Sequence, residues 1–329
     1  MKKLTHGMLA ASLAAVLATT TVQIAAAQDV TIRVAYENNP GEPVDIIMNE
    51  WKELISERSN GEIALELFPS SQLGSKQDIT DQAIMGLNVI TITDVGFLAE
   101  YEPDLGILYG PYLTDDPQKL FDVKDGEWFA EMSERLRTEH GVRIIIPNLL
   151  YGVRHLISKD PVRTPEDLAG MRIRVPNNIM QIRAIEAMGG VPTPMPLGEV
   201  FTALSQGVID AVENPIAVLH GQRFHEEAKF LSMIGYLTNA ALFVGGEAFF
   251  ETLSDEHMQI VLETGYEAGL RSQELVTDLD NAMLDDMREA GVEVIEVDVE
   301  AFRALTLPVY EMFPEWSEGL YEMIQAEMQ

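Results

Sequence analysis

Short β-branched stretches alternate with amphipathic helical stretches along most of the chain, and this alternation is the strongest constraint on its fold. Residues 29–36 and 63–68 alternate apolar and polar side chains in the manner of strands, whereas residues 43–58 repeat apolar side chains at helical spacing. Strands and helices in this order favour an α/β fold around a largely parallel sheet. We expect further strands at residues 88–93, 144–151, 171–176 and 208–212, with helices between them.

The domain organisation follows from the chain length and from the lack of a linker in the sequence. The 329 residues are enough for two domains, yet no repeat, low-complexity segment or Pro/Gly-rich spacer divides them. Residues 144–151 are expected to cross between the domains, and residues 254–288 are long enough for extended helices. Two domains that exchange strands are therefore favoured over two separately folded units.

The N-terminus has the three parts of a secretory signal peptide. Lys2 and Lys3 supply the positive start, residues 8–22 form the apolar stretch, and residues 25–27 are alanines, so cleavage is expected after Ala27. A transmembrane anchor is the alternative, but the stretch is short for a bilayer and contains three threonines. We expect a protein exported to a Gram-negative periplasm, with no later segment that spans a membrane.

The charge balance excludes several classes of partner. The chain has 53 acidic and 22 basic residues, and its formal net charge is −31. Nucleic acid and anionic lipid would both be repelled by such a surface. The lack of cysteine excludes disulfides, thiolate metal sites and thiol catalysis. A salty habitat is one hypothesis for the acidity, because ions screen the self-repulsion.

Catalytic and metal-binding patterns are lacking in the sequence. The six histidines form no HExxH or HxH pattern, and the spacing of His220 and His225 is a poor one for a metal on a helix. No phosphate loop, dinucleotide-binding glycine motif or nucleophile elbow occurs. We expect no catalytic residue, no metal and no cofactor. An exported hydrolase is the alternative from a different class of protein.

Basic and amide side chains stand beside turns at the ends of expected strands. Arg154 follows the crossing strand, Arg174 lies near the carboxyl end of the strand 171–176, and Asn214 follows the strand 208–212. Ligands of open α/β sheets bind at the carboxyl ends of strands, and an arginine there can hold a carboxylate with two parallel hydrogen bonds. The pattern indicates an anion site. In the alternative interpretation, Arg174 merely pairs with surface carboxylates.

In these segments the sequence resembles the solute-binding proteins of TRAP transporters, the tripartite ATP-independent periplasmic type. The resemblance covers essentially the whole mature chain, and the order and spacing of its motifs are more specific than any one of them. The motifs are PSSQLG (69–74), GPYL (110–113), TPEDLAGMRIRVP (164–176), MGGVPTPM (188–195), EVFTALSQG (199–207) and VIDAVENP (208–215).

The resemblance implies a two-domain periplasmic binding protein fold, with strands crossing between the domains and a long connecting helix. We expect domain I to comprise residues 28–151 plus about 240–279, and domain II to comprise residues 152–239 plus about 280–329. The two domains would close on a ligand between them. The implied protein partners are the membrane permease subunits of the transporter.

The resemblance also implies roles for single residues. Arg174 matches the family's carboxylate-holding arginine, Asn214 assists it, and Arg154 matches a second arginine that many members use. Asp94 and Asn177 fall where sialic-acid binders contact their substrate. The expected substrate-binding set is Arg174, Arg154, Asn214, Asp94, Asn177, Glu37 and Leu197, of which Leu197 replaces a larger aromatic residue seen in some relatives.

The expected ligand is a small hydroxylated monocarboxylate, such as a uronate, an aldonate or a sialic-type sugar acid. Two arginines suit its carboxylate, and Asp94 suits its hydroxyl-bearing part. A C4-dicarboxylate or a 2-oxo acid is the alternative, although Asp94 would repel a second carboxylate unless Lys76 or Arg154 offsets its charge. A sensor accessory that serves a signalling partner is a third interpretation, which the sequence does not separate from transport.

Overall fold

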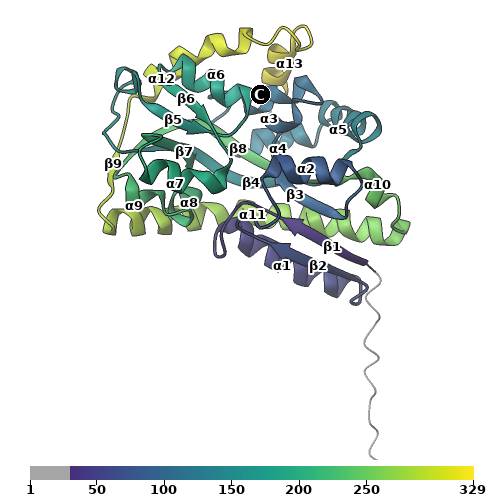
Figure 1. The fold of residues 1–329 in the computed structure, drawn as a ribbon. Helices are drawn as coiled ribbons and strands as arrows, with labels where there is room; N and C mark the ends of the chain where they lie inside the picture. The colour runs from purple at the N-terminus through teal and green to yellow at the C-terminus, as the bar shows by residue number, and fades with distance from the viewer. Residues whose placement is uncertain (1–29) are drawn as a thin grey trace, which may run out of the picture.

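One nine-stranded sheet organises residues 30–329, which are the residues that the computed structural model describes (Figure 1). The expected signal peptide, residues 1–27, lies outside the described residues. The strand order is β2-β1-β3-β8-β4-β7-β5-β6, and β9 pairs with β8. The strands are β1 (Val30–Ala35), β2 (Ile63–Phe68), β3 (Val89–Thr93), β4 (Val142–Ser158), β5 (Arg172–Val175), β6 (Val191–Pro194), β7 (Ala211–Pro215), β8 (Phe230–Gly246) and β9 (Glu293–Ile295).

The sheet is parallel toward its two ends and antiparallel at its centre. β1 pairs in parallel with β2 and β3, and β5 pairs in parallel with β6 and β7. The centre differs, because β8 pairs antiparallel with β3 and β4, and β4 pairs antiparallel with β7. The expected α/β fold is confirmed, whereas the expectation of a largely parallel sheet holds only outside the central strands.

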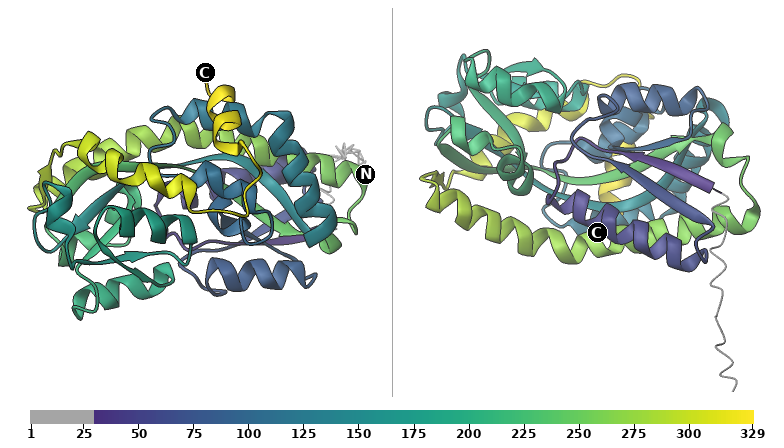
Figure 2. Two further views of the ribbon diagram at one scale, coloured as in Figure 1. Left: turned by 90° about the horizontal axis from the view of Figure 1, so that it is seen from above. Right: turned by 60° about the horizontal axis from the view of Figure 1, so that its bottom comes forward.

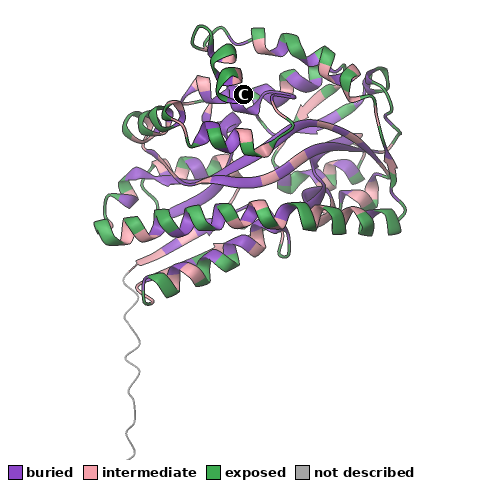
Figure 3. Cartoon of the chain, turned by 180° about the vertical axis from the view of Figure 1, so that it is seen from behind, coloured by how far each residue is buried: buried purple, intermediate pink, exposed green. Residues whose placement is uncertain are grey.

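The two central strands run through the whole molecule and join its two lobes. We call lobe I the part built on β1, β2 and β3, and lobe II the part built on β5, β6 and β7. β4 and β8 have 17 residues each and pair from Val142 with Gly246 to Ser158 with Phe230. Figure 3 shows both strands as largely buried ribbons. The expected crossing strand, residues 144–151, lies in the first part of β4, which continues past Arg154 to Ser158. The expected domain boundaries remain a prediction.

A long helix also connects the lobes. α11 packs against α1 of lobe I, along β4, and against α8 of lobe II (Figure 2). Its first turn is capped by the Ser254 side chain, which accepts a hydrogen bond from the His257 backbone. The helices are α1 (Pro43–Arg58), α2 (Lys76–Ile84), α3 (Val95–Leu98), α4 (Pro117–Lys124), α5 (Glu127–His140), α6 (Ile179–Ala187), α7 (Val200–Ser205), α8 (Ile216–Gly221), α9 (Phe224–Glu227), α10 (Glu247–Phe250), α11 (Asp255–Glu289), α12 (Val299–Thr306) and α13 (Leu320–Glu327), with the 3₁₀ turns η1 (Pro103–Tyr109), η2 (Pro165–Leu168), η3 (Leu197–Glu199) and η4 (Leu307–Glu311).

Local sequence explains why several of these elements begin where they do. Pro43 opens α1 at a position that needs no backbone donor, and Asp45 and Arg58 suit the charges of the helix ends. The helix start expected at Thr164 is the 3₁₀ turn η2, in which Thr164 forms a capping box. Within residues 30–329, no helix is both long enough and apolar enough to cross a membrane.

One expected strand begins in the wrong place. The pattern of residues 208–212 predicted a strand that ends before Glu213, but β7 runs from Ala211 to Pro215. Val208 instead closes the turn after α7, donating its backbone N–H to the Ala203 carbonyl. Asn214 therefore lies inside a strand rather than after one, in register with His155 of β4.

A buried lysine stabilises the central strands where their pairing is irregular. The β4–β8 register shifts between Ile146 and Leu149, so the Pro147 carbonyl needs a donor from elsewhere. Lys124 of α4 donates from Nζ to the carbonyls of Pro147 (3.1 Å) and Ala240 (2.8 Å). Burial lowers the pKa of Lys124 to about 7, yet its neutral amine can still donate to both carbonyls.

Replacing Lys124 should destabilise this part of the fold. Lys124→Met keeps the apolar stem but donates nothing to the two carbonyls, so we expect the free energy of unfolding to fall by about 1–3 kcal/mol. Urea denaturation measures this change. The exposed Lys52 of α1 provides the control: Lys52→Met should change the free energy by less than about 0.5 kcal/mol. Equal losses in both variants would contradict the assigned role.

Candidate functional site

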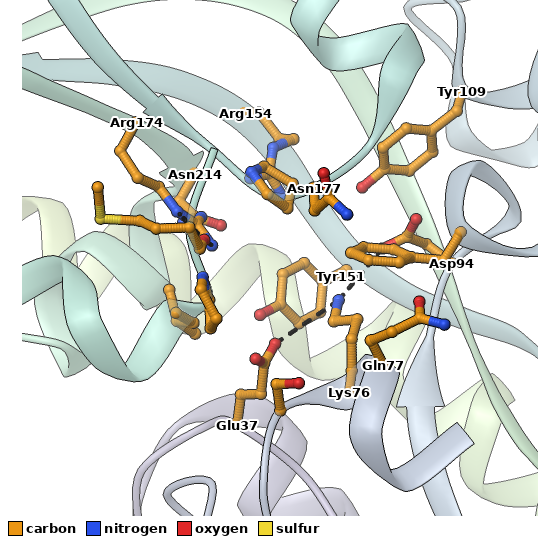
Figure 4. A pocket seen from close by; sticks show the side chains of 16 residues that line it. Glu37, Lys76, Gln77, Asp94, Tyr109, Tyr151, Arg154, Arg174, Asn177 and Asn214 are labelled. Atoms are coloured by element: carbon orange, nitrogen blue, oxygen red, sulfur yellow. Dashed lines mark hydrogen bonds and ion pairs between the residues drawn. The ribbon is translucent and has the colours of Figure 1, made fainter. Parts of the chain in front are cut away.

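A cavity between the lobes brings together every residue of the expected substrate-binding set. The cavity encloses about 520 Å³ when the part that is open to solvent is counted. Side chains from both lobes point into it (Figure 4). It is lined by Glu37, Ser75, Lys76, Gln77, Asp94, Phe97, Tyr109, Tyr151, Arg154, Arg174, Pro176, Asn177, Met195, Pro196, Leu197 and Asn214. The structure shows that these residues line the cavity, whereas their contact with a ligand remains a prediction.

Strand pairing places the basic residues of the cavity next to one another. β5 pairs with β7 so that Arg174 is in register with Val212. β7 pairs in turn with β4, which puts Asn214 opposite His155 and one residue away from the register of Arg154. Three neighbouring strands thus present Arg174, Asn214 and Arg154 to one wall. The anion site expected from the strand ends is therefore a wall of adjacent strands.

Arg154 is held in a buried ion pair. Its Nε and Nη2 lie 2.5 and 2.9 Å from the two carboxylate oxygens of Glu213, and Nη2 also donates to the Glu213 carbonyl at 3.0 Å. Glu213 is fully buried and accepts further bonds from Gln181 Nε2 (3.2 Å) and Tyr236 Oη (2.6 Å). Burial alone would lower the pKa of Arg154, but the Glu213 carboxylate raises it well above its ordinary value.

Arg174 is buried without such a partner. Its side chain is 3% exposed, and its Nε and Nη2 donate to the Met195 carbonyl at 3.1 and 2.8 Å. Among the described residues, no carboxylate forms an ion pair with it, and burial lowers its pKa. The alternative in which Arg174 pairs with surface carboxylates is wrong; that description fits Arg172, which pairs with Asp210.

A second unsatisfied donor lines the same wall. The Nδ2 of Asn214 is buried and has no hydrogen-bond partner among the described residues. A buried polar group without a partner is rare in a folded protein, because it costs about 1–3 kcal/mol. Arg174 supplies positive charge beside this free N–H. The wall can therefore donate charge-assisted hydrogen bonds to an oxyanion.

The wall from lobe I carries mixed charge. Lys76 Nζ lies 3.2 Å from Asp94 Oδ2 and 3.8 Å from Glu37 Oε2, and 5.0 Å from the centre of the Phe97 ring. Two carboxylates thus face one ammonium, and the group keeps one net negative charge. Asp94 Oδ1 also accepts a bond from Asn178 Nδ2 at 3.4 Å. Carboxylate oxygens in this arrangement are acceptors for ligand hydroxyl groups.

Sequence reasoning missed several lining residues. The Tyr109 hydroxyl accepts a bond from Asn239 Nδ2 at 2.9 Å, which leaves its own O–H free to donate into the cavity. Burial, reinforced by the charge of Asp94, raises the pKa of Tyr109 well above its ordinary value and keeps it a phenol. Tyr109 stands directly before the GPYL motif, the only signal that could have pointed to it. Tyr151 and Gln77 carry no such signal.

Two further expected residues differ in exposure. Leu197, the first residue of η3, is 4% exposed and adds apolar surface beside Met195 and Pro196. Asn177 is exposed although it lines the cavity, so it lies at the mouth.

Comparisons with known proteins agree on one family. The model of the bacterial extracellular solute-binding proteins, family 7, matches residues 34–315. The 2,3-diketo-L-gulonate-binding periplasmic protein of Escherichia coli is 33% identical over 95% of this chain and 94% of its own length. A TRAP periplasmic solute-binding protein of Ochrobacterium anthropi, solved with bound L-fuconate, is 64% identical, with a TM-score of 0.90 over 92% of this chain and 100% of that chain. A TRAP protein of Actinobacillus succinogenes, solved with L-galactonate, is 41% identical, with a TM-score of 0.89 over 91% of this chain and 99% of that one.

The two arginines should contribute to stability to very different degrees when the protein is free of ligand. Arg154→Met leaves the Glu213 carboxylate buried without its partner, so the free energy of unfolding should fall by about 3–5 kcal/mol. Arg174→Met loses the bonds to one carbonyl but also removes a buried cation that has no carboxylate partner. Its free energy of unfolding should stay within about 1 kcal/mol of the wild type.

Urea denaturation of protein refolded from denaturant, which removes any co-purified ligand, measures both variants. A large loss in Arg174→Met would show that its charge is compensated in the ligand-free protein.

Proposed function

The chain belongs to the bacterial extracellular solute-binding protein family 7, and we propose that it captures a six-carbon sugar acid such as L-fuconate between its lobes. The single observation that carries this proposal is the buried, carboxylate-free Arg174 beside the unpaired Nδ2 of Asn214. A carboxylate in reach of both would accept charge-assisted bonds from the guanidinium and one from the amide. Arg154 adds a second guanidinium face from the same wall.

The opposite wall supports hydroxyl groups on the remainder of the ligand. Glu37 and Asp94 offer carboxylate oxygens, Lys76 offers an ammonium, and Tyr109 offers a phenol donor. A chain or ring that carries several hydroxyls can pair with all of these groups. The relatives solved with L-fuconate and with L-galactonate hold ligands of this chemistry.

A C4-dicarboxylate suits this cavity less well because it carries a second carboxylate, and an unhydroxylated 2-oxo acid because it has no hydroxyl groups for the lobe I wall. Lys76 offsets one of the two acidic charges on the lobe I wall, but Glu37 and Asp94 together exceed it. A second ligand carboxylate there would face a wall with net negative charge. The expected repulsion is thus reduced by Lys76 but not removed.

The capture step needs relative movement of the two lobes. Residues on both sides line the cavity, so a ligand that touches both sides favours the closed form. We place the division at the boundaries expected from sequence, with residues 28–151 and about 240–279 in domain I and residues 152–239 and about 280–329 in domain II. The closed form would then deliver the ligand to the membrane permease subunits of a TRAP transporter.

Export and the lack of catalysis complete the proposal. The protein would be exported to the periplasm, with its signal peptide cleaved after Ala27. Binding alone, without a cofactor or a chemical step on the ligand, accounts for the features of the cavity. An exported hydrolase would instead release a product from the bound acid, which mass spectrometry of the incubated ligand detects.

A panel of acids tests the ligand class. L-Fuconate, L-galactonate and D-glucuronate should raise the melting temperature, whereas succinate and pyruvate should raise it little. At a ligand concentration a hundred times the dissociation constant, the stabilisation is about 2.7 kcal/mol. The sugar-acid assignment is wrong if only succinate or pyruvate shifts the melting curve.

Arg174 variants test the carboxylate anchor. Arg174→Ala should weaken the binding of L-fuconate by about 3–5 kcal/mol, because the ligand carboxylate stays buried without its partner. Arg174→Lys should also bind weakly, because lysine keeps the charge but loses the planar fork. Arg172→Ala, two residues away on the same strand and at the surface, is the matched control and should change affinity by less than about 1 kcal/mol.

Titration calorimetry on the three variants decides the point. Wild-type affinity in Arg174→Ala would remove the residue from the binding site.

A further inference from the structure

The lobes also meet at a second place, outside the cavity. The segment between β1 and α1 lies against the C-terminal end of α8, so lobe I touches lobe II. Asn39 Nδ2 donates to the Gly221 carbonyl at 3.1 Å, and Gln222 Nε2 donates to Glu42 Oε1 at 2.9 Å. We call this contact the clasp. We propose that the clasp positions the closed lobes and sets how long a ligand is retained, an inference that rests on the proposed function.

Residues of lobe I orient the Glu42 side chain before lobe II contacts it. Its Oε2 accepts a bond from Asn38 Nδ2 at 2.6 Å, and its Oε1 accepts one from the Asn39 backbone at 2.9 Å. Both bonds come from lobe I, and they hold the rotamer of the Glu42 side chain there. A group that is already ordered loses little conformational entropy when Gln222 arrives from lobe II.

Gly221 makes the close approach possible. A Cβ atom at this position would lie 2.3 Å from Glu42 Cγ and 2.7 Å from Glu42 Oε1, which is closer than atoms can pack. The backbone of Gly221 does not have the positive φ that favours glycine. Glycine is therefore needed here for the contact between the lobes, and not for the conformation of α8.

The clasp connects to the cavity without lining it. Glu37 stands at the start of the same segment and lines the cavity, and Gln222 Nε2 lies 3.4 Å from its carbonyl oxygen. Asn38 Nδ2 also donates to the hydroxyl of Tyr151, another lining residue, at 3.2 Å. Glu42, Gly221 and Gln222 do not line the cavity. Their effect on binding would come from the position of the lobes alone.

Gly221→Ala is the direct test, because its methyl group forms a wedge between the lobes. The dissociation constant for L-fuconate should rise about tenfold or more, mainly through faster dissociation measured by stopped flow. The ligand-free protein should unfold at the same or a higher denaturant concentration than the wild type, since alanine favours a helix over glycine. A variant that merely disturbed folding would lose stability in the ligand-free state.

A double-mutant cycle shows whether Glu42 is the group that the wedge meets. Glu42→Ala alone should also weaken binding, because the clasp is lost. Adding Gly221→Ala to Glu42→Ala should cost much less than Gly221→Ala costs in the wild type. Arg223→Ala, beside the clasp but exposed and paired with Glu226, is the control and should bind as the wild type does.

The possible outcomes distinguish a failure of the clasp proposal from a failure of the proposed ligand assignment. The ratio of variant to wild-type affinity is measured with L-fuconate, or with whichever acid of the panel the wild type binds. Failure of L-fuconate to bind the wild type counts against the proposed function and leaves this ratio measurable. Wild-type affinity and dissociation rate in Gly221→Ala would overturn the clasp, as would equal costs of the wedge with and without Glu42.

Discussion

Arg154 of β4 and Glu213 of β7 form a buried ion pair that joins a strand running between the lobes to a strand of lobe II. Because Glu213 neutralises Arg154, only Arg174 on this wall lacks a carboxylate partner among the described residues. One uncompensated cation matches one ligand carboxylate, whereas two would favour a dianion. The same pair fixes the backbone of Glu213, and with it the neighbouring Asn214. The charge selectivity that we propose thus depends on a residue that does not line the cavity.

Local sequence patterns predicted the helices and strands well, but they did not predict which strands pair with each other. The helix expected at residues 43–58 is α1, and one of the helices expected between the strands at 171–176 and 208–212 is α6. The predicted start of β7 was wrong, and so was the prediction that the centre of the sheet is parallel. Both depend on which strand lies beside which, and the apolar pattern of one segment carries no information on that pairing.

The prediction of the candidate site had the same limit: its residues were predicted, but the contacts between distant residues were not. All seven expected residues line the cavity, although Asn214 and Arg154 lie inside strands and not at the strand ends where the sequence placed them. The partnership of Glu213 with Arg154 was not predicted, since 59 positions separate the two residues. Nor was the approach of Glu42 to Gln222, which are separated by 180 positions. Residues of different lobes become neighbours only when β4, β8 and α11 fix the position of one lobe relative to the other.

The irregular pairing of β4 and β8 has a mechanical consequence. Their register shifts at four places between Ile144 and Leu156, in the stretch that joins the lobes, while both outer ends pair regularly. Bulges increase local twist and bend a strand, so deformation would concentrate in this stretch. Two continuous strands and a helix resist bending elastically, unlike a flexible loop. The angle between the lobes should therefore vary over a narrow range, with a restoring force that grows as they separate.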